Sequence, residues 1–320
     1  MNSSCPVQEA GGCRMGIELP RPVGFVLGGG GSLGAVQVGM LRALTKHSIT
    51  PDGITGTSVG ALNGAMLASF EDGLERLETA WVGIKQDDIF PDNLLEMIWR
   101  LGRSRTHAVE NAPLRSMIEK TIAHERFEQL PIPLRVVTLD LLTGTEVVFK
   151  AGPLTPALLA TAAIPGVFPA VNIDGQELVD GGIVSNVPVK QALAAGAASL
   201  VVLDTTVPAD PDHLSTGRGA RVRDVLARVT EIQFRAQLLA SLPSVAAEVP
   251  VLYLPPPTPR TVSPVDFTQS DALIEDAYDV ADRFLSSIVV DGAGIYGDPY
   301  TRYVVGRANR RLDAATDIET

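Results

Sequence analysis

The feature that most constrains the fold is an alternation of short apolar runs with helical patterns early in the chain. Residues 23–27 (VGFVL) are apolar and lead into four consecutive glycines, Gly28 to Gly31. From residue 33 to residue 46, apolar side chains recur at the three- and four-residue spacing of an amphipathic helix. A brief strand at residues 54–56 is then followed by a helix of small residues. The order strand, helix, strand, helix predicts a parallel α/β sheet.

The rest of the chain continues the same pattern. Further strands are predicted at residues 134–142, 146–150, 171–173, 177–179, 200–204 and 251–254. Helices are predicted at residues 155–163, 221–242 and 271–287. No internal repeat or linker divides the chain, so we expect one α/β domain over residues 21–290. A flexible N-terminal tail (1–20) and a peripheral C-terminal segment (291–320) are expected to flank it.

Composition narrows the kinds of protein this chain resembles. The 320 residues are 45% hydrophobic and 20% charged, which is typical of a folded globular protein. A formal net charge of −11 argues against nucleic-acid binding. Cys5 and Cys13 lie in the N-terminal stretch and predict neither a disulfide framework nor a metal site. With no apolar run of about 20 residues and no secretion-signal pattern, we expect a cytoplasmic location.

The second predicted strand ends in a motif that is typical of a nucleophilic serine. Gly56-Thr57-Ser58-Val59-Gly60 matches G-x-S-x-G, in which small neighbours allow a sharp strand-to-helix turn. A serine in this place could also be an ordinary helix N-cap. Its position between a strand and a helix of small residues favours the nucleophile.

The glycine loop before it has two interpretations. Free backbone N–H groups after a strand can bind a developing oxyanion. Alternatively, Gly29, Gly31 and Gly34 satisfy the G-x-G-x-x-G pattern of a dinucleotide site, with Asp52 as the ribose acid. Asp52 precedes the second strand, whereas a ribose acid belongs at that strand's carboxyl end. The dinucleotide hypothesis is therefore the weaker of the two.

A candidate base follows a later strand. Asp180-Gly181-Gly182 places a carboxylate at the end of an apolar run, although Asp-Gly is also a common turn dipeptide. The chain has four histidines, at positions 47, 107, 124 and 213. His213 follows Ser58 and Asp180 in the chain order of an α/β-hydrolase triad. A Ser58–Asp180–His213 triad is therefore an alternative to a Ser–Asp pair.

Taken together, these motifs resemble the patatin-like phospholipases. The ordered set is the glycine loop, G-x-S-x-G, the A-x-P-x-x-F-P segment at residues 163–169, and D-G-G followed by N-x-P. The resemblance covers roughly residues 21–205. It implies a three-layer α/β/α fold with a mostly parallel central sheet and a catalytic dyad without histidine.

By the same resemblance, Ser58 is the nucleophile of an acyl-enzyme mechanism and Asp180 is its general base. The backbone amides of Gly30 and Gly31, with Gly29 or Ser32, would form the oxyanion hole. The remaining motif glycines it implies are Gly34, Gly56, Gly60, Gly181 and Gly182. The implied chemistry needs no metal and no cofactor.

The resemblance implies a lipid or fatty-ester substrate and leaves open a transient contact with a membrane surface. Leu33 departs from the family pattern, which usually has Arg or Lys there. Leucine cannot pair with a phosphate, so a lysophospholipid, an acylglycerol or a simple fatty ester becomes more plausible than a diacylphospholipid. A catalytically inactive interaction protein is a further alternative. The sequence does not indicate an oligomeric state.

Overall fold

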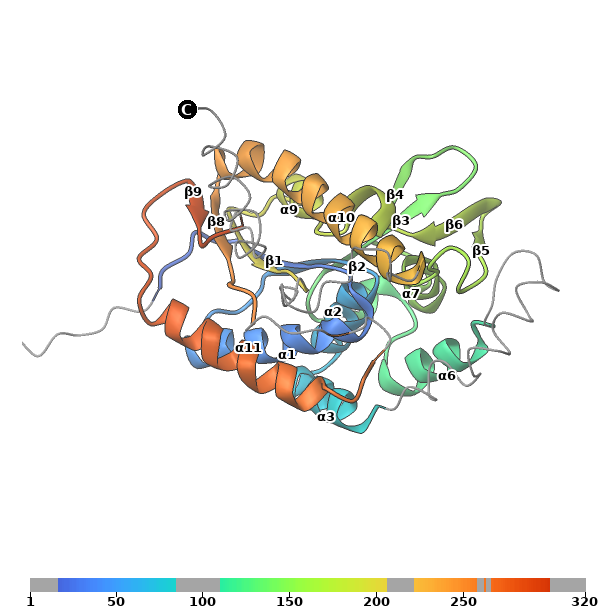
Figure 1. The fold of residues 1–320 in the computed structure, drawn as a ribbon, viewed down its shortest axis with the longest axis horizontal. Helices are drawn as coiled ribbons and strands as arrows, with labels where there is room; N and C mark the ends of the chain where they lie inside the picture. The colour runs from blue at the N-terminus through green and yellow to red at the C-terminus, as the bar shows by residue number, and fades with distance from the viewer. Residues whose placement is uncertain (1–16, 85–109, 206–221, 258–261, 263–265, 300–320) are drawn as a thin grey trace, which may run out of the picture.

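The computed structural model describes residues 17–84, 110–205, 222–257, 262 and 266–299, and the structural statements below concern these residues. One sheet crosses the middle of the molecule, with the strand order β5-β6-β3-β2-β1-β7-β8-β9, and β4 pairs with β3 outside this path (Figure 1). The strands are β1 (Val23–Leu27), β2 (Gly53–Thr57), β3 (Leu134–Asp140), β4 (Glu146–Phe149), β5 (Val171–Ile173), β6 (Gln176–Asp180), β7 (Ser199–Leu203), β8 (Pro250–Tyr253) and β9 (Gly294–Tyr296).

The sheet is mostly parallel, as predicted. Strand β1 lies between β2 and β7, and the parallel pairing continues through β3 on one side and through β8 and β9 on the other. Only the β4, β5 and β6 end of the sheet is antiparallel. The carboxyl ends of β1, β2, β3 and β7 therefore meet at one edge, which is where ligands bind in open α/β sheets.

Helices cover both faces of the sheet (Figure 1). Helices α1, α2, α3 and α11 lie below it in this view, and α9 and α10 lie above it. The helical segments are η1 (Gly31–Gly34), α1 (Ala35–Lys46), α2 (Val59–Ser69), α3 (Gly73–Gly83), α6 (Ala112–Thr121), η2 (Phe127–Gln129), α7 (Leu154–Thr161), α8 (Gly182–Ser185), α9 (Val189–Ala194), α10 (Val222–Ala246) and α11 (Ser270–Leu285). The chain thus has the three-layer α/β/α architecture expected from the sequence.

Alternation along the central strands builds two apolar cores. Phe25 and Leu27 of β1 belong to the larger core, which also contains the buried faces of α1, α2, α7 and α11. Val26, one residue along, joins Val202 of β7 in the second core, beneath α9 and α10. Strands buried on both faces read as continuous apolar runs, which explains why they were predictable.

Several segments differ from the sequence-based expectation. The short helices α8 and α9 were not predicted, and α10 extends to Ala246, beyond the predicted end at residue 242. Strand β9 lies within the segment expected to be peripheral and forms the edge of the sheet beside β8. Residues 1–16 of the predicted tail and residues 300–320 lie outside the described part of the chain.

Polar and charged side chains join the last turn of α1 to α11. Lys46 Nζ lies 2.8 Å from Asp282 Oδ2, and His47 Nε2 lies 2.9 Å from Asp282 Oδ1. The guanidinium of Arg42 lies 4.7 Å from the centre of the Tyr278 ring. These contacts join the end of α1 to α11 on the outside of the larger core.

Candidate active site

Ser58 occupies the turn between β2 and α2 in a conformation that few residues adopt. Its backbone has φ 53° and ψ −129°, outside the regions favoured by residues other than glycine. Such strain costs about 1–3 kcal/mol and persists only where the surroundings enforce it. A Cβ built on Gly56 would lie 2.7 Å from backbone atoms of Ala61, and one on Gly60 would collide with backbone carbonyl oxygens. Both glycines of the motif are therefore required by the crowded turn.

The topology of β3 brings Asp180 to this serine. Thr57, the last residue of β2, pairs with Val137 of β3. The next residue of β3, Thr138, pairs with Asp180 at the end of β6. Because β4 occupies the opposite edge of β3 here, β2 and β6 follow one another along a single edge. The Ser58 hydroxyl donates to Asp180 Oδ2 over 2.6 Å.

Burial makes the Asp180 carboxylate a stronger base. Ser58 is 8% exposed and Asp180 is 7% exposed, so little water reaches either side chain. Burial raises the pKa of Asp180 from 3.8 to about 6, against the opposing effect of hydrogen bonds from the Ser58 hydroxyl and the Gly182 N–H. A carboxylate with a pKa near 6 is ionised at neutral pH and is a better proton acceptor than an exposed aspartate.

The backbone of Ser58 is held by a residue that the sequence analysis missed. Its N–H donates to Thr161 Oγ1 over 2.8 Å, and the Thr161 hydroxyl donates to the carbonyl of Val137. Thr161 ends α7 and is fully buried. It therefore links the strained turn to β3 through two hydrogen bonds.

The glycine loop lies against the serine. A Cβ built on Gly29 would be 3.0 Å from the Ser58 Cβ, so only glycine fits there. The Gly29 N–H, however, donates to the carbonyl of Asn186 over 3.1 Å. This corrects the expectation that Gly29 is an oxyanion donor, since its N–H is already engaged. Within the described part of the chain, the N–H groups of Gly30 and Gly31 donate to no acceptor.

The other predicted loop residues are Ser32 and Gly34, with Leu33 between them. Ser32 is fully buried within η1. Gly34 ends that segment, where a Cβ would lie 2.6 Å from Val59 Cγ2. Leu33 is partly buried and packs against the larger core. The side chain at this departure from the family pattern is therefore apolar and contributes to packing.

Gly181 and Gly182 allow α8 to begin directly after Asp180. A Cβ on Gly181 would collide with the carbonyl of Val137. The Gly182 N–H donates to Asp180 Oδ1 over 2.8 Å. The D-G-G motif therefore fixes the second carboxylate oxygen while the first accepts from the serine.

Asp52 lies beside the first residue of β1, whereas the glycine loop follows the last residue of that strand. It accepts a hydrogen bond from the Val23 N–H over 2.6 Å and pairs with Arg21 over 2.7 Å. Val23 begins β1 and the glycine loop follows its last residue, so a strand of roughly 15 Å separates the two. This placement is incompatible with the dinucleotide hypothesis, which needs both at the carboxyl edge.

The histidines that the structure describes are engaged elsewhere. His47 pairs with Asp282, and His124 Nε2 lies 3.1 Å from the carbonyl oxygen of Ser69. His107 and His213 lie outside the described residues, so the triad alternative rests on a residue that the structure does not describe.

Neither a metal site nor a membrane-spanning helix is found in the described ranges. No group of three or more His, Cys, Asp or Glu side chains there could hold a metal ion. No described helix is both long and apolar enough to cross a membrane.

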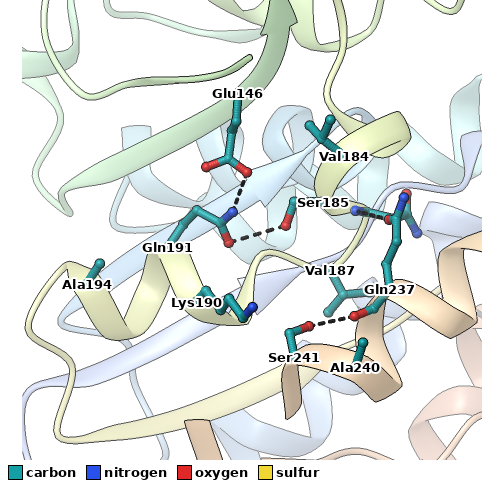
Figure 2. Close-up of a pocket in the computed structure, with 11 residues that line it drawn as sticks. Glu146, Val184, Ser185, Val187, Lys190, Gln191, Ala194, Gln237, Ala240 and Ser241 are labelled. Atoms are coloured by element: carbon teal, nitrogen blue, oxygen red, sulfur yellow. Dashed lines mark hydrogen bonds between the residues drawn. The ribbon is translucent and has the colours of Figure 1, made fainter. Parts of the chain in front are cut away.

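A pocket of about 540 Å³ lies beside the segment that follows Asp180 (Figure 2). Gln191 bridges Glu146 and Ser185 on one side of it, and Gln237 of α10 lies on the other. Its lining residues are Glu146, Val184, Ser185, Asn186, Val187, Lys190, Gln191, Ala194, Gln237, Ala240 and Ser241. Ser58 and Asp180 are not among them, so this pocket is separate from the candidate dyad.

The chain is similar in sequence to curated proteins from bacteria and animals. An "Uncharacterized NTE family protein" of Mycobacterium tuberculosis is 34% identical over 174 residues, covering 54% of this chain and 46% of the relative. The "Patatin-like phospholipase domain-containing protein 7" of Rattus norvegicus is 30% identical over 186 residues, covering 57% of this chain and 13% of the relative. The chain thus spans less than half the length of these curated relatives.

A solved structure and a family model complete the comparison. The crystal structure of VipD from Legionella pneumophila aligns with a TM-score of 0.45 and 16% identity, covering 84% of this chain and 67% of that one. The model described as "Patatin-like phospholipase" matches residues 25–193. This match spans just over half of the sequence and includes the glycine loop, Ser58 and Asp180, and the chain therefore belongs to the patatin-like phospholipase family.

Proposed function

We propose that this chain is a serine lipid acyl hydrolase that works through a Ser58–Asp180 dyad and an acyl-enzyme intermediate. The observation that carries the proposal is the 2.6 Å hydrogen bond from the Ser58 hydroxyl to Asp180 Oδ2, in a site where both side chains are buried. Membership of the patatin-like phospholipase family supports lipid esters as the substrate class.

The first half of the reaction forms the acyl-enzyme. Asp180 accepts the proton of the Ser58 hydroxyl as its oxygen attacks the carbonyl carbon of the ester. The resulting oxyanion is held by the N–H groups of Gly30 and Gly31, with Ser32 as a third candidate. When the tetrahedral intermediate collapses, the proton on Asp180 passes to the departing alcohol or lysolipid.

The second half releases the fatty acid. Asp180, again a carboxylate, accepts a proton from water as the water oxygen attacks the acyl carbonyl. Collapse of this second intermediate breaks the bond to Ser58, and the proton returns to the serine oxygen. The same base thus serves both steps, which suits a carboxylate whose pKa of about 6 lies close to the working pH.

The substrate class is proposed from Leu33. An apolar, partly buried side chain at this position offers no charge to a phosphate headgroup. We therefore expect lysophospholipids, acylglycerols and simple fatty esters to be hydrolysed with little dependence on the headgroup. Comparing kcat/KM for a lysophospholipid and a fatty-acyl ester of equal chain length tests this, and a preference of more than about 10-fold for the phosphorylated substrate would contradict it.

The decisive experiment is covalent labelling with a fluorophosphonate, followed by mass spectrometry of the labelled peptide. We expect the adduct on Ser58, and we expect Ser58→Ala to lose at least about 10⁴-fold in kcat on a fatty-acyl ester. Ser69→Ala is the matched control, because Ser69 ends the helix that follows Ser58 and its buried hydroxyl donates to the carbonyl of Ala65, away from Asp180. Hydrolysis retained by Ser58→Ala would refute the proposal. Loss of activity in both His213→Ala and Asp180→Asn would favour the triad, because a Ser58–Asp180 dyad does not require a histidine.

A further inference from the structure

The glycine loop can be followed one peptide group at a time, and the hydrogen bonds of its first two groups form a pattern. The group joining Gly28 to Gly29 is satisfied at both ends. Its carbonyl accepts from Gln37 Nε2 over 2.9 Å, and its N–H donates to Asn186. This first peptide group is therefore fixed and has no free donor.

The next peptide group, from Gly29 to Gly30, is satisfied at one end only. Its carbonyl accepts two hydrogen bonds, from Thr205 Oγ1 over 2.6 Å and from Asn186 Nδ2 over 3.1 Å. Its N–H, which belongs to Gly30, donates to no acceptor within the described part of the chain. Both donors are buried, with exposures of 3% for Thr205 and 4% for Asn186, so water does not replace them readily.

The planar geometry of the peptide group determines where the Gly30 N–H points. In a trans peptide the C=O and N–H vectors are opposed and lie in one plane. Two donors on the Gly29 carbonyl therefore fix the plane and aim the Gly30 N–H to the other side. Hydrogen bonds along one peptide group also polarise each other, which strengthens the free N–H as a donor.

The two donors are themselves anchored in the fold. Asn186 follows α8, and its N–H donates to Gln237 Oε1 on α10 over 3.3 Å, while Gln237 Nε2 donates to the carbonyl of Ile183. Thr205 follows β7 and packs so closely that a Cβ on Gly30 would collide with its hydroxyl. The donors come from segments that flank the loop, and neither belongs to the dyad.

We propose that Thr205 and Asn186 are positioning residues that hold the Gly29–Gly30 peptide group so that the Gly30 N–H is an oriented oxyanion donor. This inference rests on the proposed acyl hydrolase function. Both side chains donate to the Gly29 carbonyl, on the side of the peptide group opposite the Gly30 N–H. Each acts through the Gly29 carbonyl, so their loss should weaken stabilisation of the transition state while leaving substrate binding almost unchanged.

Thr205→Val is the test variant, because valine keeps the shape of threonine and removes the hydroxyl. We expect kcat on a fatty-acyl ester to fall about 10- to 100-fold, which is less than the 10²–10³-fold effect of deleting an oxyanion donor outright. KM should change by less than about 2-fold, and the rate of fluorophosphonate labelling should fall in parallel with kcat. Thr205→Ser, which restores the hydroxyl, should recover most of the activity.

Two matched variants separate this role from a general loss of stability. Thr121→Val removes a hydroxyl that bonds to Met117 on α6 and should keep the kcat of the unmodified chain. Asn186→Leu, combined with Thr205→Val, leaves the Gly29 carbonyl without either side-chain donor and should be slower than Thr205→Val alone. Circular dichroism at the assay temperature verifies that each variant is folded.

The outcomes distinguish this inference from the function on which it rests. If Ser58→Ala loses hydrolysis while folded Thr205→Val keeps its full kcat, the dyad stands and the positioning role is wrong. A Thr205→Ser variant as slow as Thr205→Val would also refute it, because the hydroxyl would then not be what matters. If the double variant is no slower than Thr205→Val alone, Asn186 has no positioning role. Hydrolysis retained by Ser58→Ala refutes the proposed function instead.

Discussion

Asp180 and Asp282 have opposite surroundings. Asp180 is buried, its partners are a serine hydroxyl and a backbone N–H, and its pKa is raised to about 6. Asp282 lies between Lys46 and His47 at the edge of α11, and hydrogen bonds from these two side chains lower its pKa. Hydrogen bonds and the charge of Lys46 stabilise the Asp282 carboxylate and thereby make it a weak base, whereas burial makes Asp180 a stronger one. The comparison shows how burial and hydrogen-bond partners shift the pKa of one residue type in opposite directions in two regions of the molecule.

The largest expected effect is on catalysis at Asp180. Asp180→Asn keeps the size of the side chain but removes the proton acceptor, so kcat on a fatty-acyl ester should fall about 10²- to 10⁴-fold. Asp282→Asn makes the same chemical change outside the site and should leave kcat unaltered. Equal losses of kcat in Asp180→Asn and Asp282→Asn would contradict a catalytic role that is specific to Asp180.

A large effect on stability is expected at the turn that presents Ser58 to Asp180. In Gly60→Ala the new methyl group would collide with the carbonyl oxygens of Leu27 and Gly28, so we expect a loss of about 3 kcal/mol or more. Among the described residues, no atom lies within 4 Å of a Cβ built on Gly83, at the end of α3. Gly83→Ala is the control and should change the free energy of unfolding by less than about 1 kcal/mol. Urea unfolding of both variants measures the difference, and a tolerated Gly60→Ala would contradict the close packing of the elbow.

The titration of Asp180 should affect activity and stability in opposite directions. Its folded pKa of about 6 lies above the ordinary value of 3.8, so the native state holds the proton more tightly than the unfolded chain. Stability should therefore decline as pH rises from about 4 through 6, by roughly 3 kcal/mol in total. Over the upper part of this range kcat/KM should rise, because the base becomes ionised.

Asp180→Asn provides the control for this titration. The variant should be more stable than the unmodified chain at pH 7.5, and the difference should vanish near pH 4. Urea unfolding at the two pH values measures it. A wild-type stability that instead increases from pH 4 to pH 7.5 relative to this variant would show that the carboxylate is stabilised in its ionised form.

The smallest expected effect belongs to Asp282. Because its pKa is lowered on folding, its contribution to stability is present above the ordinary carboxyl pKa and is lost as pH falls through the folded value. Pairs at a surface contribute little and are screened by salt. Asp282→Asn should therefore lower the Tm at pH 7 by no more than about 3 °C, and less in 1 M NaCl. A larger decrease would mean that the contact between α1 and α11 depends on this ion pair.

The parts of the fold that follow local patterns could be predicted. Strands β1, β3 and β7 are buried apolar runs, and the G-x-S-x-G turn shows its requirement for small residues in the sequence itself. Strand β9 is Gly-Ile-Tyr, too short to show any periodicity, and it exists because β8 offers it a free edge. Its formation depends on a neighbour and not on its own residues.

The site could be predicted only where a side chain belongs to a motif. Ser58 and Asp180 belong to G-x-S-x-G and D-G-G, so the sequence predicts both, and the structure brings them within hydrogen-bond distance of each other. Thr161 and Thr205 belong to no motif and bond to backbone groups far away in the sequence, and Thr205 is 176 residues from the Gly29 carbonyl. Asn186 belongs to the N-x-P motif, but the motif does not show that its side chain donates to the same carbonyl 157 residues away. Such a partner leaves no local signal, because any carbonyl can accept from any donor. The engagement of the Gly29 N–H was unpredictable for the same reason.

The shared edge of β3 has a consequence for how activity arises during folding. Ser58 and Asp180 are 122 residues apart, and they meet only when β2 and β6 are both aligned along β3. Contacts of such long sequence separation form late, since the entropy of closing the loop opposes them. A chain that has formed the turn at Ser58 but has not yet docked β6 lacks the hydrogen bond from Ser58 to Asp180. Under the proposed mechanism, ester hydrolysis should therefore appear only after β6 has docked on β3.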